Sequence, residues 1–124
     1  MEFFGYRKLF AYVKACEVRR SVYRLLPSFP KEEQFALCSQ LRRASVSVTS
    51  NIAEGMTRNS SKDKIHFLEM AYGSLMEVMS QLEVAEEEKY ISEAEFSNIE
   101  VLIAETARLI TGLQKSFDTS NSQL

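Results

Sequence analysis

The sequence predicts an all-α protein, folded as a single up-down-up-down antiparallel four-helix bundle. Three observations lead to this prediction. Glycine (4) and proline (2) are scarce among the 124 residues, which disfavours a fold rich in turns. Apolar residues recur three and four positions apart along four long segments, as they do on one face of an α-helix. The breaks between these segments are short, and short connections force long helices to pack as antiparallel neighbours.

The first helix is predicted over residues 6–26, and the second over residues 31–58. The segment Pro27-Ser28-Phe29-Pro30 separates them, because proline cannot continue a helical hydrogen-bond ladder. Residues 45–50 (SVSVTS) alternate as a β-strand would. No partner strand occurs elsewhere, and the apolar stripe of the second helix continues through them, so we predict that they are helical.

The third helix is predicted over residues 61–89, and the fourth over residues 93–117. Ser60 and Asp63 resemble a capping box at the start of the third helix, and Ser92 and Glu95 form a proper one at the start of the fourth. The polar residues 118–124 are predicted to be a disordered tail. The whole chain, residues 1–124, is therefore expected to form one domain.

Charge is distributed unevenly along the chain, although the net charge is only −2. Residues 1–64 contain twelve Lys and Arg against six Asp and Glu, whereas residues 65–124 contain three against eleven. The first half is thus strongly basic and the second half strongly acidic. This asymmetry is the most informative global feature of the sequence.

The residue inventory argues against catalysis. A di-iron bundle needs two Glu-x-x-His motifs, whereas His66 is the single histidine of the chain. Glu83 and Glu86 have the spacing of one magnesium-binding acidic pair, but the following helix lacks the second pair. No glycine-rich phosphate loop occurs. We therefore expect no enzyme activity, no catalytic residue, no metal and no cofactor.

Other features bear on the compartment of the protein. The N-terminus lacks the pattern of a secretion signal, and no apolar run approaches the roughly 18 residues of a membrane span. Cys16 and Cys38 are too few for a disulfide framework, although we expect them at similar levels of adjacent helices. We expect a cytoplasmic protein that is not in a membrane, with both thiols free.

Two motifs on the second and third helices predict a polar seam between them. Spacings of three and four residues place the polar residues of each helix on one face. In an antiparallel pair, Arg43 would form a buried or half-buried ion pair with Glu77, and Gly73 would allow close approach opposite Ser47. We interpret the seam as structural, with a ligand site or a subunit contact as alternatives; its residues are Arg43, Ser47, Asn51, Glu54, Gly73, Ser74 and Glu77.

Basic residues of the first half form a second candidate surface. It has three interpretations: a subunit interface that docks on the acidic half of a neighbouring copy, a phosphate-binding surface for RNA or DNA, or a solvated face. Its residues are Arg19, Arg20, Arg24, Arg42, Lys62 and Lys64.

Three segments of this chain carry a resemblance to a known protein family: residues 29–33 (FPKEE), 40–55 (QLRRASVSVTSNIAEG) and 67–77 (FLEMAYGSLME). They resemble the four-helix-bundle proteins encoded in intervening sequences of bacterial 23S ribosomal RNA genes. The resemblance spans roughly residues 6–117 and implies a closed bundle and a homopentameric ring. The chain is also similar to accessory proteins of diversity-generating retroelements, which associate with nucleic acid and a reverse transcriptase. Those relatives are strongly basic, whereas this chain is mildly acidic.

Together, these patterns predict a non-enzymatic, ring-forming oligomeric scaffold or adaptor whose partner is another copy of itself. The alternative is an RNA-binding protein that uses the basic face of the first two helices. Binding of RNA that weakens steeply with rising salt would distinguish the second function from the first.

Overall fold

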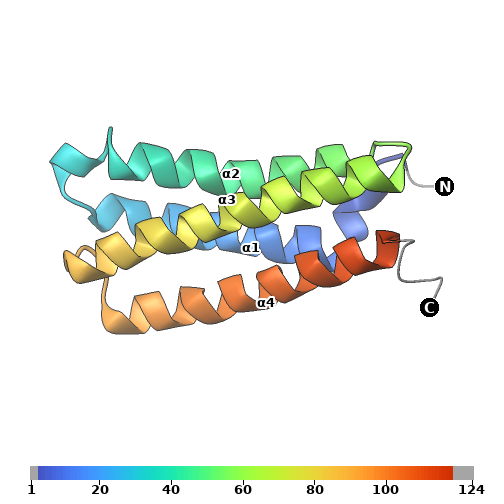
Figure 1. The fold of residues 1–124 in the computed structure, drawn as a ribbon. Helices are drawn as coiled ribbons and strands as arrows, with labels where there is room; N and C mark the ends of the chain where they lie inside the picture. Colours follow the sequence, from blue (N-terminus) through green and yellow to red (C-terminus); the bar gives the residue numbers. More distant parts are fainter. Residues whose placement is uncertain (1–2, 119–124) are drawn as a thin grey trace.

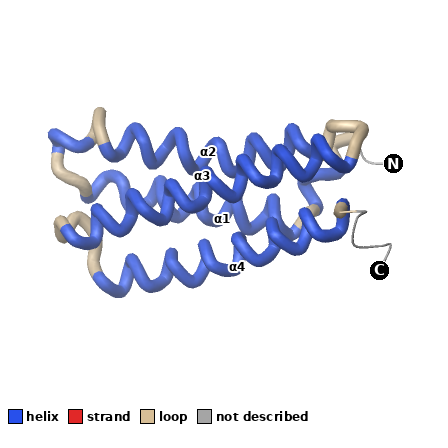
Figure 2. Tube along the Cα trace, in the orientation of Figure 1, coloured by secondary structure: helices blue, strands red, loops and turns tan. Residues whose placement is uncertain are grey.

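The predicted all-α four-helix bundle is confirmed by a computed structural model, which describes residues 3–118 (Figure 1). Figure 2 shows helices and connecting loops, and no strand, in this part of the chain. The four long helices are α1 (Phe10–Leu25), α2 (Leu37–Gly55), α3 (Ser61–Glu87) and α4 (Glu93–Phe117). Three short 3-10 helices accompany them: η1 (Gly5–Lys8), η2 (Leu26–Ser28) and η3 (Lys31–Glu33). The predicted tail lies outside the described residues from position 119 onward.

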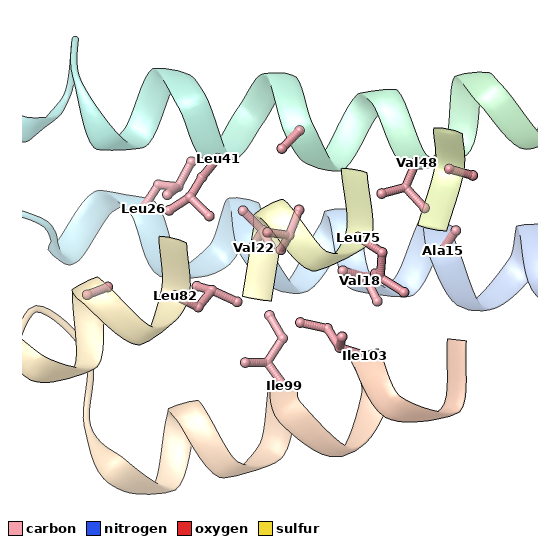
Figure 3. Packing of buried hydrophobic residues seen from close by; sticks show 14 of the residues in the cluster. Ala15, Val18, Val22, Leu26, Leu41, Val48, Leu75, Leu82, Ile99 and Ile103 are labelled. Atoms are coloured by element: carbon pink, nitrogen blue, oxygen red, sulfur yellow. The ribbon is translucent and has the colours of Figure 1, made fainter. Parts of the chain in front are cut away.

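A single apolar core runs along the axis of the bundle. Each helix packs against the one before it and the one after it in the chain, and α1 also packs against α4. Figure 3 shows side chains from all four helices meeting between them. The largest residues among them are almost fully buried, for example Val22, Leu41, Leu75 and Ile103. Removal of these apolar surfaces from water is the main driving force for the fold.

The strand-like segment 45–50 is helical, as predicted. Ser45 and Thr49 are buried there, and their hydroxyl groups donate hydrogen bonds to the carbonyl oxygens of Arg42 (3.0 Å) and Val46 (2.9 Å). Both hydroxyls are therefore satisfied within the helix, which removes the cost of burying them. Their β propensity is overruled by burial of the apolar stripe on the same helix.

Serine caps fix the starts of α3 and α4. Ser60 Oγ accepts a hydrogen bond from the Asp63 amide at 3.1 Å. At α4, Ser92 Oγ accepts from the Glu95 amide (3.0 Å), and Glu95 Oε1 accepts from the Ser92 amide (2.9 Å), which completes the predicted capping box. These bonds satisfy amide groups that have no partner inside a helix. The bounds of α4 are the predicted ones, residues 93–117.

The start of the second helix differs from the prediction: α2 begins at Leu37 and not at residue 31. The Gln34 side-chain amide donates hydrogen bonds to the Leu26 (3.0 Å) and Phe29 (3.3 Å) carbonyls, which fastens the connection to the end of α1. Ala36 then takes a backbone conformation outside the helical region, with φ −116° and ψ −97°. The intervening residues therefore form η3 and a turn instead of a first helical turn.

The other helix ends also differ by a few residues. The first helix begins at Phe10 and not at residue 6, because η1 occupies the four residues Gly5–Lys8. The second ends at Gly55 and not at residue 58. The third ends at Glu87 and not at residue 89, since Lys89 takes a left-handed conformation (φ 63°) that stops the helix.

Close approach of α2 and α3 occurs at Gly55, and the prediction that Gly73 provides it is wrong. A Cβ atom on Gly55 would lie 2.8 Å from the Cβ of Phe67 on α3. Gly55 is buried, at the end of α2 nearest the turn that leads to α3. Gly73 is exposed, and a Cβ atom there would meet nothing within 4 Å. The glycine that permits close contact between the two helices is therefore the one near their connecting turn.

Alanine at these two glycines is expected to change stability in opposite directions. Gly55→Ala should destabilise the protein by about 1–3 kcal/mol, because the new methyl group overpacks against Phe67. Gly73→Ala should stabilise it by about 0.5–1 kcal/mol, because alanine loses less backbone entropy in an exposed helix. Equilibrium urea unfolding, followed by circular dichroism, measures both changes. Equal shifts for the two variants would contradict the assigned contact.

Candidate functional site

A polar groove of about 610 Å³ runs between α2 and α3 along the predicted seam. Its walls come from both helices: Gln40, Arg43, Ala44, Ser47, Ser74 and Glu77. Four of these residues belong to the predicted seam. Gln40 does not, although it extends the polar stripe of α2 by one helical turn before Arg43. Continuing the polar stripe of α2 by one helical turn in the sequence would have predicted Gln40 as a seam residue.

Hydroxyl and amide groups join the two helices at the floor of the groove. Ser47 Oγ and Ser74 Oγ lie 2.9 Å apart and share a hydrogen bond. The Asn51 amide donates to Ser47 Oγ at 3.1 Å and to the Ser47 carbonyl at 2.9 Å. All three side chains are half-buried. The network therefore links α2 to α3 without placing a charge inside the bundle.

The prediction of a buried ion pair between Arg43 and Glu77 is wrong. The two residues line the same groove, but both are exposed, and no ion pair joins them within residues 3–118. Where they lie, the groove is open to water, so each charge stays hydrated and gains little from pairing. The Glu54 carboxylate pairs with Arg58 of its own chain segment at 2.8 Å, and the Arg58 guanidinium lies 4.5 Å from the centre of the Phe67 ring on α3.

The six basic residues of the second candidate surface do not form one face. Arg24 and Arg42 lie toward the end of the bundle where α1 connects to α2, whereas Lys62 and Lys64 lie at the opposite end, where α2 connects to α3 (Figure 1). Arg19 is half-buried, and its guanidinium donates to Thr49 Oγ1 at 3.3 Å. The basic residues predicted to form one surface are thus split between two ends of the bundle that are separated by the length of α2.

Lys64 is occupied by a structural contact. Its ammonium group donates hydrogen bonds to the carbonyl oxygens of Met56 (3.3 Å) and Arg58, just after the end of α2. It also lies 5.7 Å from the centre of the Phe117 ring. A cation at this position complements the negative end of the α2 dipole. The lysine therefore caps a helix and joins the third and fourth helices.

Three arginines remain exposed toward the other end: Arg20 and Arg24 on α1, and Arg42 on α2. None of their guanidinium groups forms an ion pair or a hydrogen bond with another described residue. Tyr23, which is 44% exposed, lies on α1 between Arg20 and Arg24 in sequence. Arginine and an accessible aromatic ring are the groups that bind phosphate and stack on unpaired bases.

Charge separates across the bundle as well as along the sequence. The helices α1 and α2 contain six Lys and Arg against two Glu, whereas α3 and α4 contain four Lys and Arg against ten Asp and Glu. Because each helix packs mainly on its two neighbours, these helix pairs form opposite sides of the bundle. One side is basic and the other acidic.

The groups most suited to chemistry are dispersed. Within residues 3–118, no cluster of three His, Cys, Asp or Glu residues could hold a metal ion. His66 is exposed, with its ring at the edge of Phe67. In the same part of the chain, none of the helices is both long enough and apolar enough to cross a membrane.

Both cysteines are free, as predicted, and both are buried. The expectation that they lie at the same level is wrong, because Cys38 packs at the far end of α1, with its sulfur 3.9 Å from the Leu26 carbonyl. Burial raises the pKa of the Cys38 thiol. A raised pKa disfavours the thiolate, which is the reactive form.

Known proteins resemble this chain in sequence and fold. The family described as 23S rRNA-intervening sequence protein matches residues 7–112. A crystal structure from Bacteroides thetaiotaomicron, of a protein with unknown function from the S23 ribosomal protein family, superposes with a TM-score of 0.77. It covers 85% of this chain and 98% of its own, at 23% identity, a level at which the likeness concerns the fold. No match was found among curated proteins.

Ser47→Ala should destabilise the protein more than Arg43→Ala or Glu77→Ala. Loss of the Ser47 hydroxyl breaks bonds to Ser74 and Asn51 and should cost about 1 kcal/mol. Each of the two charge deletions should change the free energy of unfolding by less than about 0.5 kcal/mol, because both side chains are hydrated. Urea unfolding of the three variants compares them directly. A loss of several kcal/mol in either charge variant would restore the ion pair that the structure lacks.

Proposed function

This chain belongs to the 23S rRNA-intervening sequence protein family, and from that premise we propose that it is a non-catalytic scaffold or adaptor that assembles with copies of itself into a ring. The resemblance of its motifs to this family favours five copies.

The charge distribution of the bundle is the observation that carries this proposal. Its basic side, α1 and α2, and its acidic side, α3 and α4, face opposite directions. The basic side of one copy therefore complements the acidic side of the next. Such a contact is head-to-tail, and head-to-tail contacts close into a ring when the rotation between copies permits.

Apolar surface must supply most of the affinity, since exposed ion pairs contribute only about 0–1 kcal/mol each. The described surface offers large apolar side chains on both sides. Val46 and Tyr23 are exposed on the basic side, and Met76, Val84 and Val101 on the acidic side. Charge then sets the orientation and the rate of encounter, whereas burial of these groups holds the copies together.

Charge reversal on the basic side should shift assembly toward smaller species. We expect the double variant Arg20→Glu/Arg24→Glu to assemble roughly twofold to thirtyfold more weakly, because two favourable contacts become repulsive. Size-exclusion chromatography with light scattering over a concentration series measures this shift, and circular dichroism checks that the helices persist.

The matched control is Lys62→Glu/Lys115→Glu, which makes the same change in net charge on the acidic side, where both lysines are exposed. It should weaken assembly less, because its new charges add to a side that is already acidic. Wild-type protein that remains monomeric at micromolar concentration and physiological salt would refute self-assembly.

RNA binding is the second candidate, and the exposed Arg20 and Arg24 side chains, which flank Tyr23 in the sequence of α1, are the observation that favours it. This patch is small, and the net charge of −2 opposes long-range attraction of a polyanion. Binding would therefore rest on local contacts to phosphates and stacking on one ring.

Fluorescence anisotropy with a labelled single-stranded RNA oligonucleotide tests this candidate. If it is correct, affinity should fall steeply between about 50 and 200 mM salt, and Arg20→Glu/Arg24→Glu should abolish binding while Lys62→Glu/Lys115→Glu retains most of it. Absence of binding at low salt, or equal losses in the two variants, would exclude this patch as an RNA site.

A further inference from the structure

Phe35 is an exposed aromatic side chain on a connection that is held in place. It is 95% exposed, in the turn between η3 and α2. Figure 2 shows this connection rising clear of the helices at one end of the bundle. The residues before it are anchored, because Gln34 bonds to the Leu26 and Phe29 carbonyls and Glu33 accepts a hydrogen bond from the Tyr90 hydroxyl at 2.9 Å. The ring is therefore presented to solvent at a defined place.

An apolar hollow lies at the other end of the bundle, between the start of α1 and the last turns of α4. Its volume is about 300 Å³. A cavity of about 150 Å³ lined by apolar side chains can hold a benzene molecule, so this hollow has room for a phenyl ring. Gly112 keeps it open, because no atom lies within 4 Å of the place where a Cβ would stand. Its other apolar walls include Leu9, Phe10, Leu109 and Leu113.

The two features are alike in polarity and lie near charged residues of opposite sign. Phe10, at the edge of the hollow, is itself 77% exposed and offers a second ring for an aromatic contact. Glu32, which is exposed, lies three residues before Phe35, and Arg108, also exposed, lines the hollow. A negative charge near the ring and a positive charge at the hollow favour contact between the two surfaces.

The ring and the hollow of one chain cannot meet each other. The 19 residues of α2 alone extend about 28 Å along the bundle, and the two features lie beyond its opposite ends. The occupant that the molecule itself supplies is therefore the Phe35 ring of a second copy. Because the two surfaces differ, the contact is heterologous and can repeat from copy to copy.

We propose that Phe35 of one copy inserts into the α1–α4 hollow of the next copy, and that this contact anchors self-assembly. This inference rests on the proposed function, since it names the contact through which the scaffold assembles. It accounts for a phenylalanine at a fully exposed position on an anchored turn. It also accounts for a glycine in an exposed helical position of α4, where a side chain would fill the hollow.

Two single variants test the contact by blocking each half of it. Phe35→Ser removes the inserted ring, and Gly112→Leu fills the hollow with the variant's own side chain. Both positions are exposed, so the helical content should stay as in the wild type. Light scattering over a concentration series should show assembly weakened by about tenfold to a hundredfold in each variant.

The matched controls are Met70→Ser and Gly73→Leu. Met70 is an exposed apolar residue of α3 outside the hollow, and Gly73 is a second exposed helical glycine with open space around it. Both controls should assemble within about threefold of the wild type, since neither touches the ring or the hollow. Assembly lost in the controls but retained in Phe35→Ser and Gly112→Leu would overturn the proposal.

Cross-linking tests the pairing itself. Phe35→Cys and Gly112→Cys proteins are mixed and oxidised, with wild type as the control for Cys16 and Cys38, which are buried. A disulfide-linked dimer should form in the mixture and not in either protein alone, because each cysteine faces the other variant's position. An assembling protein without this mixed disulfide overturns the contact alone, whereas a monomeric wild type overturns self-assembly and the contact together.

Discussion

Simultaneous burial of four apolar stripes is the constraint on which the rest of this structure depends. No helix of the bundle can bury its stripe alone, so each of them packs against two neighbours around one core. The three buried polar side chains within residues 3–118, Ser45, Thr49 and Thr106, bond to carbonyl groups of their own helices. The core therefore needs no buried charge, and the charged residues are left on the surface.

At the surface, the interfaces between neighbouring helices differ in polarity. The α2–α3 interface is polar along its outer edge, where hydroxyl groups meet between the helices and Arg43 and Glu77 remain hydrated. The α1–α4 interface is apolar at one end, where Gly112 leaves a hollow unfilled. A closed bundle would be expected to fill such a hollow with its own side chain. An unfilled apolar hollow beside the exposed Phe10 ring adds nothing to the stability of the bundle. It is the kind of surface that binds another protein.

The surface of the described residues supports the proposal of self-assembly. The described residues contain no group of three His, Cys, Asp or Glu residues that could hold a metal ion, and the charge of the helices is divided into two sides of opposite sign. Surfaces of this kind orient partners and set encounter rates, whereas apolar contacts determine how long the partners stay together. An assembly through both kinds of contact would place identical surfaces at regular intervals, which is the property that a scaffold needs.

The sequence by itself determined the class of fold, the number of long helices and both serine caps, because periodicity and capping act between residues close in the chain. It also located Ser47, Asn51 and Ser74 on facing sides of two helices. Only the tertiary structure decided where α2 begins, because Gln34 reaches back to the end of α1. It likewise decided that Arg43 and Glu77 stay in water and that Lys64 caps α2, since these outcomes depend on how far apart the packed helices hold their side chains.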